Sequence, residues 1–189
     1  MMMKSMAVAC LGLGLGLLCG AQAKPAPAAA RPPELAALNV SLGRWVFHGT
    51  SAPRTPGGQP GAWTWNEDCH WSPNHLFLDC TFSNVWSGRA IESLVVDTYN
   101  TRDHSYWHYE MFQSGSAGAH PFAAKMEIAG NTWTEYGAAG ADGKPHERIV
   151  YVWGAGSAPA TVKVTIETTK DGEHWTTADQ GTGTRLGRG

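Results

Sequence analysis

The sequence Leu42-Gly43-Arg44-Trp45-Val46-Phe47-His48-Gly49 sets a glycine at the start of a short strand, a tryptophan two positions later and a second glycine at its end. A brief helical segment, 33–38, precedes it, and alternating strands separated by turn residues follow it. Gly43 permits a sharp turn from the helix into the strand because it lacks a Cβ, and Trp45 is large enough to cap one end of a cavity. This order of elements is typical of the beginning of an antiparallel β-barrel.

The rest of the chain alternates in the same way. No stretch after residue 42 has sustained helical periodicity, and the pairs Gly130-Asn131, Asp142-Gly143 and Asp171-Gly172 supply the positive φ angles that tight turns require. Strands so close in sequence pair with their neighbours, and closing the sheet removes its edges. We therefore predict an all-β, up-and-down antiparallel barrel of about ten strands with a short N-terminal helix. The expected strands are 43–50, 61–71, 75–84, 90–99, 105–113, 122–128, 132–138, 146–153, 161–169 and 174–185.

The N-terminus has the pattern of a secretory signal. Lys4 is the positive flank, residues 6–18 are the apolar core, and Ala21-Gln22-Ala23 is a small-x-small cleavage site. A retained membrane anchor is the alternative, but the repeated Leu-Gly pairs and the cleavage site argue against it. We expect a signal peptide at 1–23, a Pro/Ala-rich tether at 24–33 and a barrel domain at 34–189. The mature chain, without a membrane span, would then be periplasmic or secreted.

Composition limits the partners and the fold. With 14 Lys and Arg against 16 Asp and Glu, and no basic or acidic block, the charge does not indicate nucleic acid or an anionic membrane. Glycine is frequent, at 23 residues, and tryptophan is unusually so, at 9. This balance suits many short strands joined by turns and is poor for a helical bundle.

Two cysteines fix one hairpin. Cys10 and Cys19 leave with the signal peptide, so Cys69 and Cys80 remain, and in an oxidising compartment they most simply form one disulfide. Placing them opposite each other puts the apolar faces of both strands on the same side of the sheet, so hydrophobic pattern and disulfide demand one register. Those faces carry Trp63, Trp65, Glu67, Cys69 and Trp71 on one strand, and Leu76, Leu78, Cys80 and Phe82 on the other.

Several motifs together resemble the calycin group of lipocalin-like barrels, and within it the exported bacterial proteins of unassigned function. The matching stretches are Leu42-Gly43-Arg44-Trp45 through Gly49, Trp63-Thr64-Trp65, Tyr99-Asn100-Thr101-Arg102-Asp103-His104-Ser105-Tyr106, Glu167-Thr168-Thr169-Lys170-Asp171-Gly172-Glu173-His174-Trp175 and Thr184-Arg185. The resemblance extends over nearly all of the predicted mature chain. It implies an up-and-down barrel that encloses a cavity for a small hydrophobic ligand.

Large side chains are the candidates for contact with such a ligand. A barrel of about ten strands is wider than its own side chains readily fill, so stacked aromatic residues would line a pocket rather than close it. Any one of them could instead belong to the packed core. The set comprises Trp45, Trp63, Trp65, Trp107, Tyr109 and Met111.

Glu67 is the one acid on an otherwise apolar face. A buried carboxylate must be paired, hydrogen-bonded or protonated, because burying it bare costs several kcal/mol. It would therefore orient the polar end of a ligand, with Arg148 as a partner from a later strand. The alternative is that Glu67 lies at the barrel mouth and is solvated.

Asp97, His108 and Glu110 form the one constellation with the features of acid-base chemistry. If Tyr99 pairs with Tyr106, Asp97 falls opposite His108, and a histidine between carboxylates can act as general acid or base. The same register places Trp107, Tyr109 and Met111 on the other face, with Leu94 and Val96. Because that face is more apolar, we expect it to point inward and the polar trio to be a solvated charge cluster.

The sequence predicts neither a metal nor a cofactor. His104, His108 and Glu110 resemble a two-histidine, one-carboxylate set, but His104 lies in a turn. Haem would require an inward histidine late in the chain, and His146 and His174 both lie beside turns. The chain has no phosphate-binding glycine loop, no Gly-x-Ser-x-Gly elbow and no candidate catalytic cysteine.

The leading hypothesis is a non-enzymatic, exported carrier or sensor that holds a small hydrophobic or amphipathic molecule inside a barrel. The first alternative is a lipocalin-like isomerase or hydrolase that uses His108 with Asp97 and Glu110. The second is a module that binds another exported protein through its rim loops.

Overall fold

The computed structural model describes residues 30–187, except 54, 56, 87–88, 115–118, 138 and 157–158. The chain divides into two units, Met1–Ala30 and Arg31–Gly189, and the fold given below is that of the second. The predicted signal peptide and most of the predicted tether lie outside the described residues.

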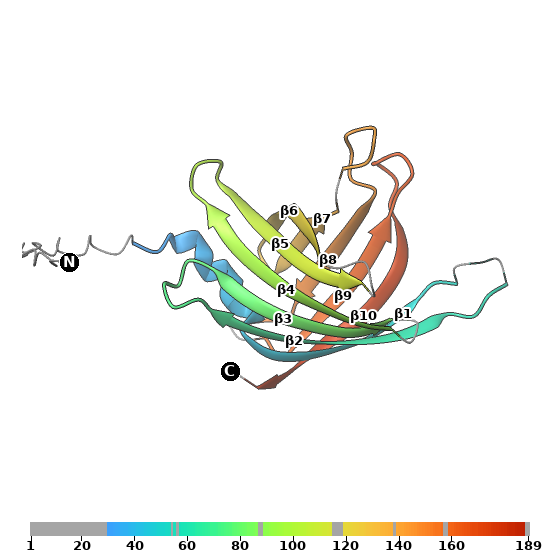
Figure 1. The fold of residues 1–189 in the computed structure, drawn as a ribbon, viewed down its shortest axis with the longest axis horizontal. Helices are drawn as coiled ribbons and strands as arrows, with labels where there is room; N and C mark the ends of the chain where they lie inside the picture. Colours follow the sequence, from blue (N-terminus) through green and yellow to red (C-terminus); the bar gives the residue numbers. More distant parts are fainter. Residues whose placement is uncertain are drawn as a thin grey trace, which may run out of the picture. The chain divides into compact units, whose positions relative to one another are not determined.

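Within the described part of the chain, ten antiparallel strands close into a barrel in the order β1-β10-β9-β8-β7-β6-β5-β4-β3-β2 (Figure 1). Each strand pairs with its neighbours in sequence, and the last pairs with the first, so the predicted up-and-down barrel is confirmed. The strands are β1 (Gly43–Ser51), β2 (Gly61–Trp71), β3 (Leu78–Trp86), β4 (Arg89–Asn100), β5 (Ser105–Ser114), β6 (Ala119–Ala129), β7 (Thr132–Tyr136), β8 (Glu147–Trp153), β9 (Thr161–Thr168) and β10 (Thr176–Gly187).

The register of the β2–β3 hairpin is the one that the cysteines and the apolar pattern require. Cys69 lies opposite Cys80, and the two form a disulfide. Glycine provides the predicted positive φ at the turns, with values of 63° at Gly130, 76° at Gly143 and 77° at Gly172. These three turns therefore follow from local sequence chemistry.

The 3₁₀ helix η1 (Pro33–Ser41) packs against one end of the barrel. Its Leu35 and Leu38 are fully buried, and its backbone accepts a hydrogen bond from the indole of Trp45 through the Ser41 carbonyl at 2.8 Å. Trp45 is itself buried and lies edge-on to Trp153. The helix and Trp45 therefore pack together against the core at this end of the barrel. No helix within the described residues has the length and apolar character needed to cross a bilayer.

Glycines let large rings lie flat against the junction of β1 and β10. A Cβ at Gly49 or Gly181 would overlap the indole of Trp63, and one at Gly183 would overlap the ring of Phe47. Trp63 in turn stacks on Trp65, with 4.4 Å between ring centroids. The absence of side chains at these glycines is therefore a packing requirement of the aromatic core.

The β4–β5 hairpin has the predicted register but the opposite orientation. Tyr99 pairs with Tyr106 and Asp97 with His108, yet Tyr109 and Met111 are 44% and 51% exposed and lie on the outer face. The prediction that this apolar face points inward was wrong. The reason lies in the next strand, because β3 places Cys80 and Leu78 directly opposite Val95 and Asp97, and directly opposed residues share a face. The residues on the outer face are Leu94, Val96, Trp107, Tyr109 and Met111.

Candidate functional site: an interior cavity with an acidic cluster

The barrel contains a partly open cavity of about 400 Å³. Its wall combines aromatic rings with carboxyl groups, so both an apolar and a polar group of a small molecule would find contacts there. The aromatic part comprises Trp65, Phe82, Phe122, Trp133, Tyr151 and Trp153, and the acidic part comprises Glu67, Asp97, Glu110 and Glu135 around His108.

The centre of the acidic part is a buried pair on β4 and β5. The side chains of Asp97 and His108 are almost completely buried, and Nδ1 of His108 lies 2.9 Å from Oδ1 of Asp97. This is the pairing that the sequence predicts, but it lies inside the barrel and not on its surface. The prediction that Asp97, His108 and Glu110 form a solvated cluster was therefore wrong.

Two further carboxyl groups complete the surroundings of the imidazole. Oε1 of Glu135, on β7, lies 3.7 Å from Nδ1 of His108, and Oε2 of Glu110 lies 4.0 Å from its Nε2. Glu135 is buried to the same degree as His108, whereas Glu110 is partly exposed. Both nitrogens of His108 thus face acidic oxygens.

These neighbours determine the protonation of the histidine. Burial alone would lower the pKa of His108, but the carboxylates of Glu135 and Asp97 outweigh burial and raise it well above the usual value. Burial would likewise raise the pKa of Glu110, but the nearby imidazole of His108 outweighs burial and lowers it. At neutral pH, His108 is therefore an imidazolium that donates to Asp97, and Glu110 is a carboxylate.

The remaining two acids hold protons more tightly than ordinary glutamates. Burial, reinforced by the negative charges of Asp97 and Glu135, raises the pKa of Glu67 to about 8. Burial, together with Asp97 and Glu110, raises the pKa of Glu135 to about 7. Tyr151 stays a neutral phenol, because burial and the adjacent acids raise its pKa well above 10. The cavity therefore contains two carboxyl groups that titrate near neutrality.

Arg148 lines the cavity without pairing with Glu67. Its Nε donates to Oε2 of Glu167 on β9 at 2.6 Å, and its guanidinium lies over the ring of Trp175, 4.3 Å from the centroid. The predicted partnership between Arg148 and Glu67 was wrong, because the cross-strand neighbour Glu167 already provides the counter-charge.

Three buried polar atoms in the cavity wall have no hydrogen-bond partner among the described residues. They are Nε1 of Trp65, Nε1 of Trp153 and Oδ1 of Asn84. The side chains are only 5%, 3% and 9% exposed, respectively. Buried polar groups are nearly always satisfied, so these atoms can bond to water or to a polar molecule that enters the cavity.

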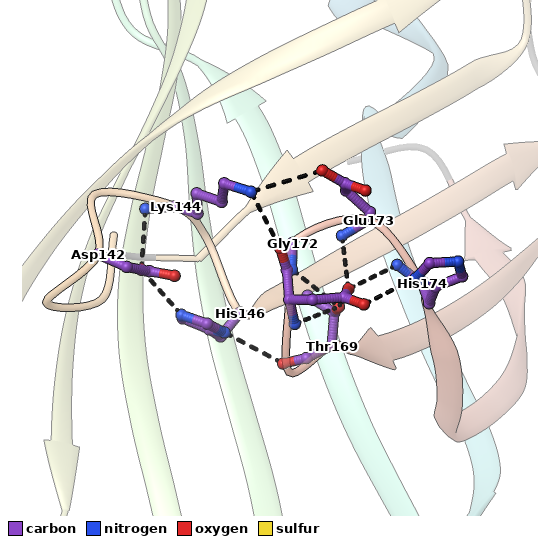
Figure 2. A network of polar contacts seen from close by, with 8 residues as sticks. Asp142, Lys144, His146, Thr169, Gly172, Glu173 and His174 are labelled. Atoms are coloured by element: carbon purple, nitrogen blue, oxygen red, sulfur yellow. Dashed lines mark hydrogen bonds and ion pairs between the residues drawn. The ribbon is translucent and has the colours of Figure 1, made fainter.

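Two loops near this cavity are held together by a polar network (Figure 2). The imidazole of His146, in the β7–β8 loop, contacts the Thr169 carbonyl at 3.1 Å and Oδ1 of Asp142 at 3.0 Å. Lys144 of the same loop donates to the carbonyl of Asp171 at 3.1 Å. This is a second contact with the β9–β10 loop. Since the cavity lining includes Gly137 and Glu147 at the two ends of the β7–β8 loop, this network fixes the loop that borders the site.

The predicted ligand-contact residues fall into three groups. Trp65, Glu67 and Arg148 line the cavity. Trp45 and Trp63 are in the packed core, as the alternative reading of the aromatic residues proposed. The predicted inward position of the others was wrong, because Trp107, Tyr109 and Met111 lie on the outer face of the β4–β5 hairpin, where Trp107 donates to Asp103 and stacks on Tyr109.

Sequence reasoning missed several cavity residues. Glu135, Tyr151, Asn84, Trp133 and Trp153 were not candidates, although each lines the cavity. The sequence does contain a signal for Glu135. Trp133-Thr134-Glu135 repeats the arrangement of Trp65-Asn66-Glu67, in which the acid lies on the same face of the strand as the tryptophan. Asn84 had no such signal, because a single amide near a strand end has no pattern.

The described residues do not offer a convincing metal or haem site. The group with metal-ligand spacing consists of Glu67, Cys69 and Cys80, and the two sulfurs are bonded to each other. His104 is exposed in the β4–β5 turn and contacts the hydroxyl of Tyr99, so it does not join His108 and Glu110 in a ligand set. His146 and His174 are engaged by loop groups, so neither supplies the late, inward imidazole that haem would need.

Comparison with known proteins supports the fold alone. No protein-family model matches the chain, and no curated protein does. Among solved structures, 14 chains match. One is the crystal structure of Rv2717c from M. tuberculosis, which is 13% identical, gives a TM-score of 0.52, and matches over 84% of this chain and 100% of its own.

Proposed function

We propose that the barrel binds a small amphipathic molecule in its interior cavity. The aromatic wall, with Trp65 and Trp153, contacts the apolar part of the molecule, and the carboxyl groups around His108 contact its polar part. The observation that carries this proposal is the set of unpartnered buried polar atoms on the wall of a cavity of about 400 Å³. That volume lies within the range of pockets that hold small organic ligands.

The test uses Nile red, a neutral dye whose emission shifts to the blue in apolar surroundings. We expect saturable binding at one site per chain and quenching of tryptophan fluorescence. Trp65→Ala, which removes a wall of the cavity, should weaken binding by about tenfold or more.

Controls separate the cavity from the apolar outer surface. Trp107→Ala removes a tryptophan from the outer face, and a Tyr109→Ser, Met111→Ser double variant removes the two most exposed apolar side chains there. Both should bind the dye as the unmodified protein does. If the outer-face variants lose the dye and Trp65→Ala retains it, the proposal is wrong.

A second candidate function is acid-base catalysis. It is favoured by the two cavity carboxyl groups with pKa values near neutrality, Glu67 at about 8 and Glu135 at about 7. A group whose pKa matches the operating pH is best suited to transfer protons, and His108 as an imidazolium can serve as a general acid. We expect hydrolysis of p-nitrophenyl acetate to fall about 100-fold in Glu135→Gln and in His108→Gln. If the unmodified protein hydrolyses the ester no faster than buffer alone, or if both variants keep its full rate, this ester hydrolysis is rejected.

The proposal includes a compartment and a family. A disulfide between Cys69 and Cys80 is compatible with an oxidising environment, and the apolar N-terminal segment has the pattern of a signal peptide. We therefore infer export after cleavage near Ala23, and a relationship to calycins in line with the closed barrel. Intact mass measurement of protein from the exported fraction of its own host tests the cleavage site; a chain that still begins at Met1 contradicts it.

A further inference from the structure

We propose that the cavity selects an organic cation, a molecule with a protonated amine on an apolar body. This inference rests on the proposed function and names the chemical class of its ligand. It is carried by two features of the same cavity, an excess of acidic groups and aromatic ring faces, and the unpartnered polar atoms add that the ligand also carries an oxygen.

The charges that face the cavity are unequal. The cavity holds four carboxyl groups against a single imidazole, and the guanidinium of Arg148 is neutralised by Glu167. Because Glu67 is mostly protonated at neutral pH, the excess negative charge lies on Asp97, Glu110 and Glu135. In surroundings that are poor in water, such an excess attracts a cation and repels an anion. The titratable groups of the cavity are Glu67 on β2, Asp97 on β4, His108 and Glu110 on β5, Glu135 on β7, and Glu147, Arg148 and Tyr151 on β8.

The unpartnered atoms point to a ligand independently of the charge. Oδ1 of Asn84 can only accept, and an amine N–H is a donor of the required kind. The indole N–H groups of Trp65 and Trp153 can only donate, so they suit an oxygen on the same ligand. Asn84 lies directly opposite Trp65 across β2 and β3, so the hairpin presents one acceptor and one donor to the same cavity.

Aromatic faces favour the same class of ligand. The ring faces of tryptophan, tyrosine and phenylalanine attract cations, and their area accommodates an apolar body. Trp65 and Phe82 lie 5.5 Å apart between centroids, and Trp133 and Trp153 lie 5.0 Å apart. A volume of about 400 Å³ exceeds the coordination shell of a metal ion, so the cation is organic.

Binding of an amine should also release protons. The positive charge of the ligand would lower the pKa of Glu67 and of Glu135, both of which are partly protonated near pH 7.5. The affinity should therefore rise between pH 6 and 8 for an amine that stays charged. An uncharged ligand of the same shape should show no such rise.

The experiment compares three probes with one shape and different charge: phenethylammonium, 2-phenylethanol and 3-phenylpropionate. Calorimetry with the full chain, disulfide intact, should show the ammonium binding at least about tenfold more tightly than the alcohol, and the propionate most weakly. Titration in buffers of different ionisation enthalpy should show release of up to about one proton per ammonium bound at pH 7.5. Glu67→Gln and Glu135→Gln should reduce the preference for the ammonium, whereas Glu92→Gln, which removes an exposed acid, should not.

The outcomes distinguish this inference from the proposed function. If the alcohol binds as tightly as the ammonium, or the propionate binds best, the cavity binds ligands but the cation inference is overturned. If Mg²⁺, Ca²⁺ or Zn²⁺ displaces the ammonium at equal concentration, the acidic groups are a metal site and the inference is again overturned. If neither the three probes nor Nile red binds to folded protein, the proposed function fails as well. The probe comparison needs no variant, so a variant that does not fold leaves the test intact.

Discussion

Replacing Glu67 by glutamine should change how the stability of the protein depends on pH. The carboxyl group lies in the cavity and its pKa is about 8 in the folded protein, whereas the ordinary value is 4.5. Between these two values the folded state binds a proton that the unfolded state has lost. The free energy of unfolding therefore falls as pH rises through this window, and it levels off above the folded pKa.

The magnitude follows from the width of the window. Each pH unit over which one proton is held by the folded state alone is worth about 1.4 kcal/mol. Between pH 6 and pH 8, Glu67 should thus account for a loss of about 2–3 kcal/mol, which is large against a typical total stability. Glutamine is close to the protonated carboxyl in shape and cannot ionise, so this part of the loss should vanish in Glu67→Gln.

Two other groups act in the same direction and will remain in the variant. Glu135 also has a raised pKa, and His108, whose pKa is raised, contributes stability that is lost as pH rises through its folded pKa. The unmodified protein should therefore show the steeper decline, and the variant a shallower one of the same sign.

Urea unfolding followed by tryptophan fluorescence, at half-unit intervals from pH 5.5 to 9, measures these free energies. Glu92→Gln, at an exposed position on β4, serves as the control and should parallel the unmodified protein. The decisive quantity is the difference in unfolding free energy between Glu67→Gln and the unmodified protein. If this difference is the same at pH 6 and pH 8, Glu67 is ionised and solvated, and the account of the acidic cluster is wrong.

Three further predictions concern the barrel and its rim. Replacing both Cys69 and Cys80 by alanine should lower the free energy of unfolding by about 2–3 kcal/mol, because the unfolded chain is no longer restrained; equal urea midpoints for the two proteins would contradict this. Gly181→Ala should lower it by about 1–3 kcal/mol, because the added Cβ overlaps Trp63, whereas Gly61→Ala, where a Cβ meets only ordinary contacts, should be nearly neutral in the same assay. His146→Ala should speed hydrogen exchange in loops 140–146 and 169–175, where His146 joins Asp142 to Thr169, and unchanged exchange would show that the other contacts hold the loops alone.

The register of the β2–β3 hairpin was predictable because two independent constraints agree on it, although β3 begins at Leu78 and not at the expected residue 75. The alternation that places Trp65 and Phe82 on one side requires the same register as a bond between Cys69 and Cys80. The turns at Gly130, Gly143 and Gly172 were predictable for a local reason, since each needs a positive φ.

The orientation of the β4–β5 hairpin was not predictable in the same way. The pairing of Tyr99 with Tyr106 fixes which residues are opposite each other, but it leaves open which face points inward. The number of apolar side chains favoured the face of Tyr109 as the inner one. Pairing with the neighbouring strand β3 instead turns Val95 and Asp97 inward. The same error placed Asp97, His108 and Glu110 on the outside. The rule that the more apolar face is buried fails for a barrel whose interior has room for polar groups.

The seam between β1 and β10 has a consequence for biogenesis. β1 is the first strand of the barrel to be made, and its partner β10 is the last. Until β10 is made, β1 and β9 each have an edge with unpaired backbone hydrogen-bonding groups. The rings of Trp63 and Phe47 also lack their contacts with Gly181 and Gly183 of β10. A chain that stops short of residue 176 would therefore be prone to pair with its copies, and synthesis must be completed before the protein is safe from aggregation.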